Sequence, residues 1–271
     1  MLTYPNIDPV ALHLGPLQIR WYGISYVVGI LLAWRLLHYR ALKQPLLGWT
    51  TVQVADLIFY GAFGVIIGGR LGSVLFSNLP YYLAHPLEII MINRGGMSFH
   101  GGLLGVLAAL WLYSRTINQT FGETTDFLAP VVPVGLFFGR IANFINGELW
   151  GAPSSLPWAV IFPDPRAGGI SRHPSQLYEA FLEGMVLFVI LWFFSEKIRP
   201  KLAVSGMFLL CYGIFRFAIE FVREPDANIG YLAFGWLTMG QVLSAPMIVA
   251  GMVLLWFAYN STRSVKQTTL F

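Results

Sequence analysis

The fold is decided by residues 125–151, which read TDFLAPVVPVGLFFGRIANFINGELWG. An apolar run long enough to cross a bilayer as a helix ends here in four polar side chains: Arg140, Asn143, Asn146 and Glu148. If the helix continues that far, Arg140 and Asn143 stand three residues apart on one face. A cation and an amide donor with the same direction in apolar surroundings predict a grip on an anionic group. The simpler alternative is that Arg140 marks the water-side end of the helix.

The composition indicates a membrane protein. Of the 271 residues, 56% are hydrophobic and 11% are charged, whereas soluble domains carry about 25% charged residues. A water-soluble fold would have to bury at least six separate apolar stretches of nearly 20 residues each. The net charge of +4 fits loop orientation and anionic lipid headgroups, and no basic block or RNA-binding motif indicates a nucleic-acid partner. We therefore expect an all-α polytopic membrane protein, with residues 1–271 as a single integral membrane domain.

The chain has one cysteine, Cys211, so it can form no internal disulfide and a cysteine-based metal site is not expected. Cys211 lies inside an apolar run, where a thiol stays protonated, so we interpret it as a small core residue rather than a nucleophile. Residues 1–20 show no basic n-region and no cleavage site, and a removable signal peptide is not expected. No metal or organic cofactor is implied.

Hydropathy predicts about seven transmembrane helices. Their expected ranges are 19–37, 52–76, a third ending near 115, 125–144, 177–194, 202–221 and 239–259. Nine of the 17 Lys and Arg residues fall on one side of this arrangement and five on the other, and the richer side should be cytoplasmic. The N-terminus is then outside and the C-terminus cytoplasmic. Residues 146–176, which hold five prolines, should form a small irregular head that faces outward.

Two glycine patterns precede the fourth predicted helix. Gly64, Gly68 and Gly72 repeat every four residues and predict a ridge that lets another helix approach closely. Residues 95–105, GGMSFHGGLLG, place five glycines around His100, which favours an irregular segment that lines a polar cavity. His100 could then be a general base, because imidazole exchanges protons near neutral pH. The alternative is a histidine that serves only packing.

Charged residues inside the apolar runs suggest a phosphate site. Tyr212, Arg216, Glu220 and Arg223 follow one helical stripe. Arg216 and Glu220 could simply neutralise each other. Because Arg70 and Arg140 lie in two further spans, we favour a polar cavity, and arginine forks match phosphate geometry.

Other polar residues have simpler interpretations. Glu179 and Glu183 share a face near the start of the fifth span, and if exposed they would only favour a helix N-terminus. Tyr22 and Tyr26 share a face at the start of the first span, where aromatic residues usually form an interfacial belt. Zinc proteases, serine hydrolases and nucleotide-driven enzymes lack support, since their usual motifs do not occur in the chain.

Four motifs resemble the prolipoprotein diacylglyceryl transferases of bacteria. They are GRIANFINGELWG at 139–151, GGMSFHGG at 95–102, RHPSQLYE at 172–179, and the run from Tyr212-Gly213-x-x-Arg216 to Pro225-Asp226. The likeness covers nearly the whole chain. The head is shorter than in some members, which leaves the docking of the protein substrate open.

The resemblance implies transfer of the diacylglyceryl group of phosphatidylglycerol to the lipobox cysteine of a prolipoprotein signal peptide. Glycerol phosphate leaves and a thioether forms, which is the first step of bacterial lipoprotein maturation. The enzyme would act in the inner membrane, toward the outer leaflet, in contact with membrane lipid. In this reading the attacking sulfur belongs to the substrate, which agrees with an inert Cys211.

The resemblance also implies roles. Arg140 and Arg216 would grip the phosphate, and His100 would take the thiol proton or orient the headgroup, with Glu148 as an alternative base. Asn143 and Glu148 would hold glycerol hydroxyls or fix the arginines. The remaining residues expected to line or bind substrate are Asn146, Gly101, Tyr22, Tyr212 and Glu220.

Two other classes of function stay open. A transporter or lipid flippase could use the same arginines to carry a headgroup, and it would predict paired repeats with broken helices. We find no convincing repeat. A non-catalytic membrane scaffold would not need arginines and a histidine exposed to one cavity.

Overall fold

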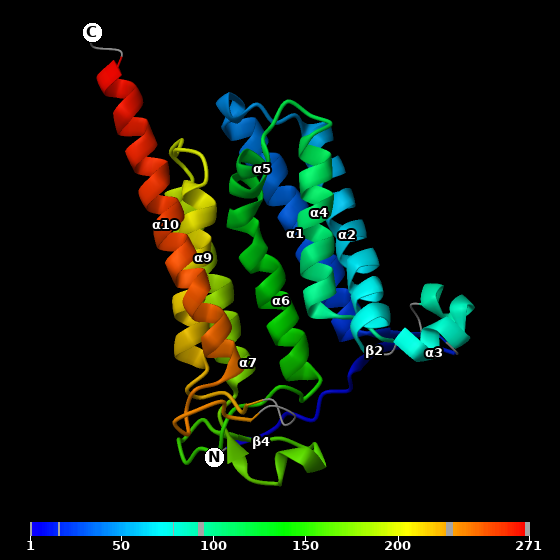
Figure 1. Cartoon of the computed structure of the whole chain (residues 1–271). Helices are drawn as coiled ribbons and strands as arrows, with labels where there is room; N and C mark the ends of the chain where they lie inside the picture. The colour runs from blue at the N-terminus through cyan, green and yellow to red at the C-terminus, as the bar shows by residue number, and fades with distance from the viewer. Residues whose placement is uncertain (1, 16, 78, 92–94, 226–229, 269–271) are drawn as a thin grey trace. The chain divides into compact units, whose positions relative to one another are not determined.

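The computed structural model describes residues 2–15, 17–77, 79–91, 95–225 and 230–268 (Figure 1). Helices make up most of it: α1 Trp21–Lys43, η1 Pro45–Leu47, α2 Thr51–Ser77, α3 Leu79–Ala84, η2 Pro86–Ile90, α4 Phe99–Ser114, α5 Phe121–Leu128, η4 Ala129–Val131, α6 Val132–Ile145, η5 Pro165–Ala167, α7 Ser175–Glu179, η6 Ala180–Val186, α8 Leu187–Phe194, α9 Ala203–Ile219 and α10 Met239–Thr268. The strands are short: β1 Leu2–Thr3, β2 Val10–Leu14, β3 Leu17–Arg20, β4 Val160–Ile161 and β5 Ser171–Arg172.

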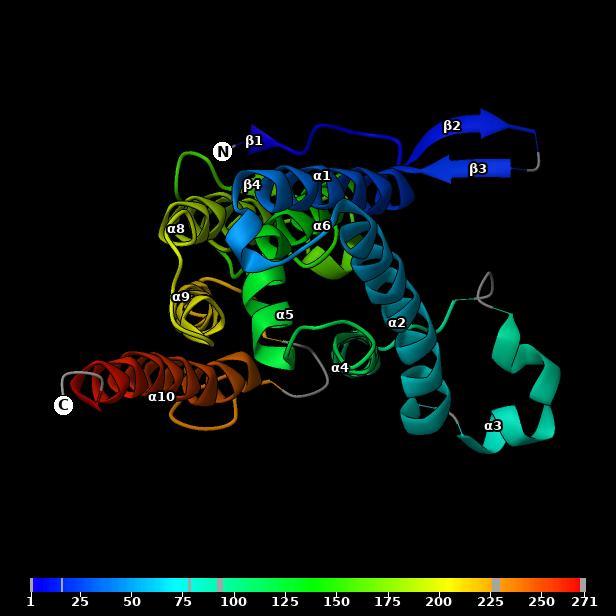
Figure 2. The same cartoon turned by 90° about the horizontal axis from the view of Figure 1, so that it is seen from above.

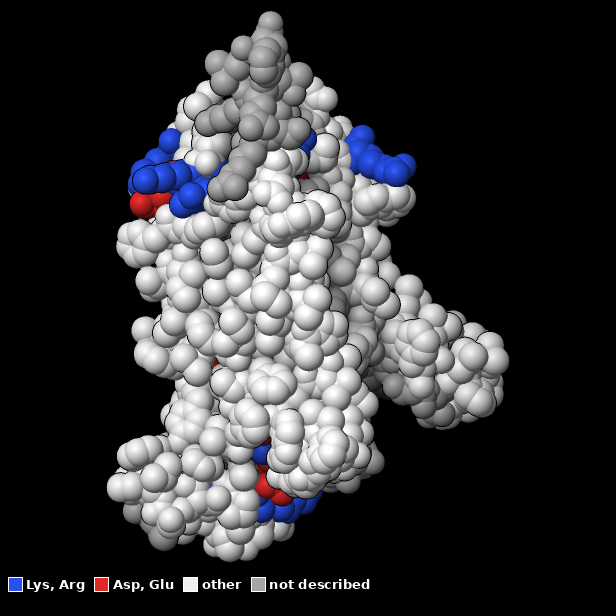
Figure 3. Space-filling view, turned by 60° about the vertical axis from the view of Figure 1, so that its left-hand side comes forward, with Lys and Arg blue, Asp and Glu red and all other residues white. Residues whose placement is uncertain are grey.

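The apolar helices are those of a membrane protein. Within the described ranges, four helical runs are long and apolar enough to cross a bilayer: Thr51–Phe76, Phe121–Ile145, Ser175–Phe194 and Met239–Ser261. Two shorter apolar helices are Phe99–Ser114 and Ala203–Ile219. Many of their large apolar side chains are exposed, and the face drawn in Figure 3 is white over most of its area. A surface of this kind is stable only in contact with lipid.

The chain divides into two compact units. One comprises residues 1–33 and 126–271, and the other comprises residues 34–125. Each is described separately below as the first unit and the second unit.

In the second unit, α2 and α4 run side by side with their backbones almost in contact (Figure 1). A Cβ atom added to Gly64 would lie 2.6 Å from the carbonyl oxygen of Gly105. The predicted glycine ridge on α2 is therefore confirmed. The prediction of an irregular segment is wrong beyond residue 98, because α4 begins at Phe99. Ser98 caps the helix by accepting a hydrogen bond from the Gly101 N–H at 3.1 Å, and the glycines that follow serve helix packing.

Arg70 on α2 is 5% exposed and faces the protein interior, as predicted. Its partners are backbone carbonyls: Nε donates to Ile89 O at 2.8 Å and Nη1 to Gly96 O at 3.1 Å. The carbonyls of Glu88 and Gly95 accept further bonds. Arg70 therefore holds the connection between α2 and α4, and its grouping with Arg140 and Arg216 stays a prediction.

In the first unit, α9 and α10 lie side by side (Figure 2). A Cβ atom on Gly251 would meet the backbone of Leu210, so small residues again permit the close approach. The N-terminus of α9 is capped by Asp126, whose Oδ1 accepts from the Ser205 N–H at 2.7 Å. Cys211 packs against an apolar cluster of α8, α9 and η4, in agreement with its expected place in the core.

The head (residues 146–176) is more regular than the sequence predicts. Its β4 pairs in parallel with β1 and antiparallel with β5, so the N-terminal strand completes a three-stranded sheet. The sheet covers a small apolar cluster whose members are Val160, Phe162, Ala167, Tyr4, Phe144 and Trp150. Most of the head is irregular, as predicted, but the two short strands were not expected, because strands of two residues are too short to produce a periodic pattern.

Candidate functional site

Arg140, near the end of α6, is paired with two glutamates from the next membrane helix. Its Nε lies 2.5 Å from Glu179 Oε2, and its Nη2 lies 3.7 Å from Glu183 Oε2. Both carboxylates are buried, with exposed side-chain fractions of 1% and 0%. Glu183 lies in η6, a π-helical stretch that directly follows α7. Wider turns of this kind are common where a helix must aim side chains at a functional site.

Two further arginines approach the same carboxylates from the end of α9. Arg216 Nη2 lies 2.5 Å from Glu220 Oε1, and Arg216 Nη1 lies 3.5 Å from Glu179 Oε1. Arg223 Nη1 lies 3.3 Å from Glu220 Oε1, and Arg223 Nε lies 3.8 Å from Glu179 Oε1. We call these six residues the arginine–glutamate network: Arg140, Arg216, Arg223, Glu179, Glu183 and Glu220. Its three positive and three negative formal charges balance.

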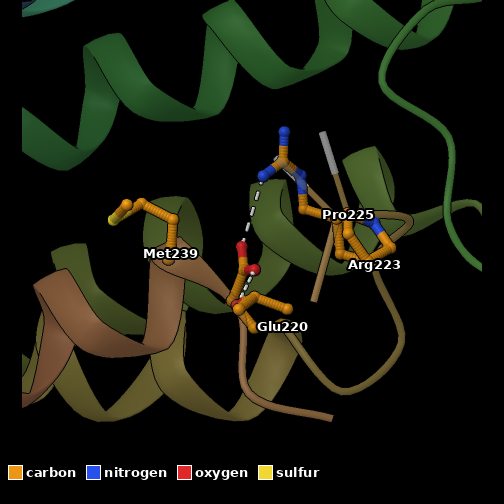
Figure 4. A pocket seen from close by; sticks show the side chains of 7 residues that line it. Glu220, Arg223, Pro225 and Met239 are labelled. Atoms are coloured by element: carbon orange, nitrogen blue, oxygen red, sulfur yellow. Dashed lines mark hydrogen bonds and ion pairs between the residues drawn. The ribbon is translucent and has the colours of Figure 1, made fainter. Parts of the chain in front are cut away.

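A small pocket adjoins one edge of the network, between the end of α9 and the start of α10. Its lining residues are Glu220, Arg223, Pro225, Gly230, Thr238, Met239 and Gly240. Figure 4 shows Arg223 and Glu220 pointing toward each other across it. Thr238 Oγ1 donates to Glu220 Oε2 at 2.6 Å, so that carboxylate is held from two sides.

Glu148 is held by the two asparagines that precede it. Asn143 Nδ2 donates to Glu148 Oε1 at 2.9 Å, and Asn146 Nδ2 donates to the same oxygen at 3.2 Å. The chain can fold back this way because α6 ends at Ile145 and Gly147 takes the left-handed conformation, with φ +66°. Gln176 Nε2 donates to the Glu148 carbonyl at 2.6 Å and joins this turn to the start of the fifth span.

The two predicted tyrosines lie near these groups. Tyr22 on α1 is within electrostatic range of Arg140 and Glu148, and its hydroxyl lies 3.4 Å from that of Tyr26. Tyr212 on α9 is within electrostatic range of Arg216 and Arg140. The role of Tyr22 as a residue that lines the substrate site stays a prediction.

The second unit carries the other two predicted site residues. His100 is exposed in the first turn of α4, with its ring edge-on to Phe99 at 5.7 Å. Gly101 packs against Gly68 and Gly72 of α2, which is a structural task. Asp226, part of one sequence motif, lies outside the described residues.

The predicted residues that the structure brings together in the first unit are Arg140, Asn143, Asn146, Glu148, Arg216, Glu220, Tyr22 and Tyr212. Glu179 and Glu183 are not among the predicted site residues, because their position near the start of a span also fits acidic residues at an exposed helix N-terminus. The signal was present: a pair of glutamates four residues apart, facing inward from an apolar run, needs cations from other spans. Arg223 belonged to the predicted stripe but was not expected to bind.

Three guanidinium groups meet three carboxylates with little exposure to water in the arginine–glutamate network. Among the described residues there is no group of three or more His, Cys, Asp or Glu placed to hold a metal ion.

His173 of the head lies outside the membrane-spanning segments. Its Nδ1 lies 3.3 Å from the Tyr178 hydroxyl, and burial lowers the pKa of its imidazole. Its ring therefore favours the neutral form.

Comparison with known proteins gives consistent matches. The model of the prolipoprotein diacylglyceryl transferase family matches residues 9–257. A phosphatidylglycerol–prolipoprotein diacylglyceryl transferase of Solidesulfovibrio magneticus is 59% identical over 255 residues, covering 94% of this chain and 96% of the relative. Proteins of the same name from Coxiella burnetii and Pseudomonas putida are 56% identical over 260 residues and 59% identical over 270 residues. These alignments cover 96% and 98% of this chain, and 98% and 99% of the relatives.

Proposed function

The chain belongs to the prolipoprotein diacylglyceryl transferase family, and we propose that it moves the diacylglyceryl group of phosphatidylglycerol to the lipobox cysteine thiol of prolipoproteins. This transfer is the first step of bacterial lipoprotein maturation. Three relatives that carry the name of this activity are 56–59% identical over nearly the whole chain. The observation in the structure that supports it best is the pair of little-exposed arginines, Arg140 and Arg216, on membrane helices.

The reaction is a displacement at carbon. The cysteine sulfur attacks the glyceryl carbon that bears the phosphate, so a C–S bond forms and the C–O bond breaks. The electron pair of that bond leaves on the phosphate oxygen as glycerol phosphate, and the thiol proton goes to a base. Arg140 and Arg216 bind the phosphate and stabilise the charge that develops as it departs. Their guanidinium groups stay charged when water is excluded, which a lysine would not guarantee.

The proton and the headgroup need separate residues. Glu148 accepts hydrogen bonds from the Asn143 and Asn146 amides, which fix the position of its carboxylate. A carboxylate held in this way suits the glycerol hydroxyls of the headgroup. We therefore assign proton removal to His100 and hydroxyl binding to Glu148, with Asn143 and Asn146 as its supports. Tyr22 and Tyr212 line the same region, and Glu220 fixes Arg216 at 2.5 Å. Gly101 is the remaining residue that we propose as a substrate contact.

Seven crossings fit the described helices. They are α1, α2, α4, the α5–α6 run, the α7–α8 run, α9 and α10. With 23 residues, α1 spans about 34 Å, which exceeds the hydrocarbon thickness of about 30 Å. The pairing of β1 with β4 requires the N-terminus and the head to lie on the same side. Four crossings between them satisfy that condition, and a seventh places the C-terminus opposite.

The distribution of Lys and Arg supports a cytoplasmic C-terminal side and an outward-facing head. The single integral membrane domain of residues 1–271 then resides in the inner membrane, with the reaction at its outer leaflet. There it meets phosphatidylglycerol and other membrane lipid, and the prolipoprotein signal peptide with its lipobox cysteine.

The test is a transfer assay with purified protein in detergent. The protein is incubated with phosphatidylglycerol and a lipobox peptide that carries one cysteine, and peptide mass and released glycerol phosphate are followed. The peptide should gain one diacylglyceryl unit. Arg140→Ala should lower the rate by about 100-fold or more, because it removes transition-state charge stabilisation. Arg166→Ala is the matched control, since Arg166 is 81% exposed on the head and pairs only with nearby Asp164 in the described contacts.

No mass gain with folded wild-type protein and intact lipid would contradict the proposal. Lipid scrambling in vesicles would then test the transporter alternative. Normal transfer by Arg140→Ala would instead reject the assignment of this arginine.

A further inference from the structure

The arginine–glutamate network holds as many carboxylates as guanidinium groups, although the proposed substrate is an anion. We propose that its glutamates, Glu179 above all, weaken the binding of phosphate so that glycerol phosphate can leave. This inference rests on the proposed function and adds to it a control of product release. Glu179 in this view is a counter-charge that tunes the site, and it need not touch the reacting atoms.

The contacts single out Glu179. It is the one member of the described network whose carboxylate lies within 4 Å of all three arginines, with Oε2 at 2.5 Å from Arg140. Its Oε1 lies 3.5 Å from Arg216 and 3.8 Å from Arg223. The side chain is 1% exposed, so water does little to screen its charge. All three guanidinium groups of the network therefore interact electrostatically with this carboxylate.

The other two carboxylates are placed differently. Glu220 is bonded to Thr238 and paired with Arg216 at 2.5 Å, so it also braces the end of α9. Glu183 makes only the longer contacts, 3.7 Å to Arg140 and 3.8 Å to Arg216. Glu183 therefore sits beside two arginines with little direct bonding, which makes it a useful second probe.

Charge balance in the network matters because the product, glycerol phosphate, carries more negative charge than the phosphatidylglycerol headgroup. A phosphodiester carries one negative charge, whereas a phosphate monoester carries about −1.5 to −2 near neutral pH. Three unopposed arginines would hold the monoester more tightly than the diester, and release would become slow. An enzyme gains nothing from binding energy that traps its product. Buried carboxylates beside the arginines reduce this excess, while leaving N–H donors in place for the transition state.

The alternative is that Glu179 only braces the arginines. The two roles predict opposite changes. Loss of a brace lets the guanidinium groups move and weakens phosphate binding. Loss of a counter-charge leaves the site with a net positive charge and strengthens phosphate binding.

The experiment measures anion binding in Glu179→Gln, which keeps the shape of the side chain and removes its charge. The full-length wild type and the full-length variant are purified. Each is assayed for the KM of phosphatidylglycerol, for kcat and for the inhibition constant of glycerol phosphate. We expect the inhibition constant to fall about tenfold, the change that about 1.4 kcal/mol of charge interaction produces. The KM of phosphatidylglycerol should fall as well. The kcat should fall because the release of glycerol phosphate becomes slower. Glu183→Gln should shift all three values the same way by a smaller factor.

Glu224→Gln is the matched control, because Glu224 pairs with Arg172 at 2.9 Å and lies outside the network. It should change the inhibition constant less than about twofold, because the Glu224 carboxylate is 42% exposed and its charge is screened by water. An unchanged or raised inhibition constant in Glu179→Gln would overturn the counter-charge role and leave a brace. If Glu179→Gln does not fold, the same measurement on Glu183→Gln decides.

Calorimetric binding of glycerol phosphate separates this inference from the function. A wild type that transfers no lipid speaks against the proposed reaction. The order of glycerol phosphate affinities among wild type, Glu179→Gln and Glu183→Gln still tests the counter-charge.

Discussion

At the scale of single residues, we propose that His100 removes the thiol proton and that Glu148 binds the headgroup. If His100 takes the thiol proton, His100→Gln should lower the rate at pH 7 by about 100-fold, the usual size of a general-base contribution. Raising the pH should restore part of that rate, because a free thiol ionises near pH 8.5 without help. Glu148→Gln should raise the KM of phosphatidylglycerol instead, since it replaces an acceptor with an amide beside the Asn143 and Asn146 donors.

Rate–pH profiles of the two variants with the single-cysteine peptide make the comparison. Near-normal turnover of His100→Gln at pH 7 would show that His100 is not the base. Recovery of Glu148→Gln, rather than His100→Gln, at high pH would pass that role to Glu148.

The residue scale also shows what a sequence can and cannot predict. The spacing of Arg140 and Asn143 predicts that both project from the end of one helix, and both lie in the last turns of α6. The acceptors themselves come from elsewhere: Arg140 meets Glu179, 39 positions later, and Asn143 meets Glu148 across a turn. A single sequence carries no information on which distant carboxylate a buried arginine will meet, so the partners were missed.

At the scale of elements, the close contact of α2 with α4 depends on glycine at defined positions. A Cβ at Gly68 would collide with the backbone of Gly105, at 2.6 Å from its Cα. Gly68→Ala should therefore destabilise the second unit by about 1–3 kcal/mol, as overpacked sites do. Gly61→Ala on the same helix is the matched control, because its Cβ would meet only Val106 Cγ2 at 3.8 Å. Thermal unfolding in detergent would reveal the difference.

Equal melting temperatures for the two alanine variants would mean that α2 and α4 can separate without loss. The comparison uses one substitution on one helix, so helix propensity does not enter it.

The elements explain why one glycine pattern was predicted correctly and the other was not. Glycines at every fourth position indicate a packing ridge whatever lies opposite. The glycines around His100 were interpreted as a ligand-facing segment, because the sequence does not show that they lie opposite that ridge. In the structure Gly101 and Gly105 face Gly68 and Gly64, so close helix packing is enough to explain why these positions are glycine.

At the scale of the whole molecule, the head is joined to the end of α9 by Arg172. Its Nε donates to Ala167 O at 2.8 Å, and its Nη1 donates to Gly151 O at 3.2 Å and lies 2.9 Å from Glu224 Oε2. Arg172→Ala leaves these carbonyls unpaired in a buried place, and we expect a loss of about 2–4 kcal/mol. Arg172→Lys should recover little, because one ammonium cannot reach three acceptors in the geometry of a guanidinium.

Limited proteolysis of residues 151–172 in the purified protein is the measurement. Faster cleavage is expected in both variants than in wild type and in Arg166→Ala, whose arginine is exposed on the same head. Equal cleavage rates would show that the head does not depend on this arginine.

The pairing of β1 with β4 has a consequence in time as well as in space. Leu2 and Val160 are 158 positions apart in the chain. At a synthesis rate of about 5–20 residues per second, the first strand waits about 8–30 s before its partner exists. During that interval the ribosome makes the helices that separate the two strands. The strand that is synthesised first, β1, can therefore pair only after β4 has been synthesised. The time at which the sheet of the head can form depends on the translation of the residues between them, most of which lie outside the head.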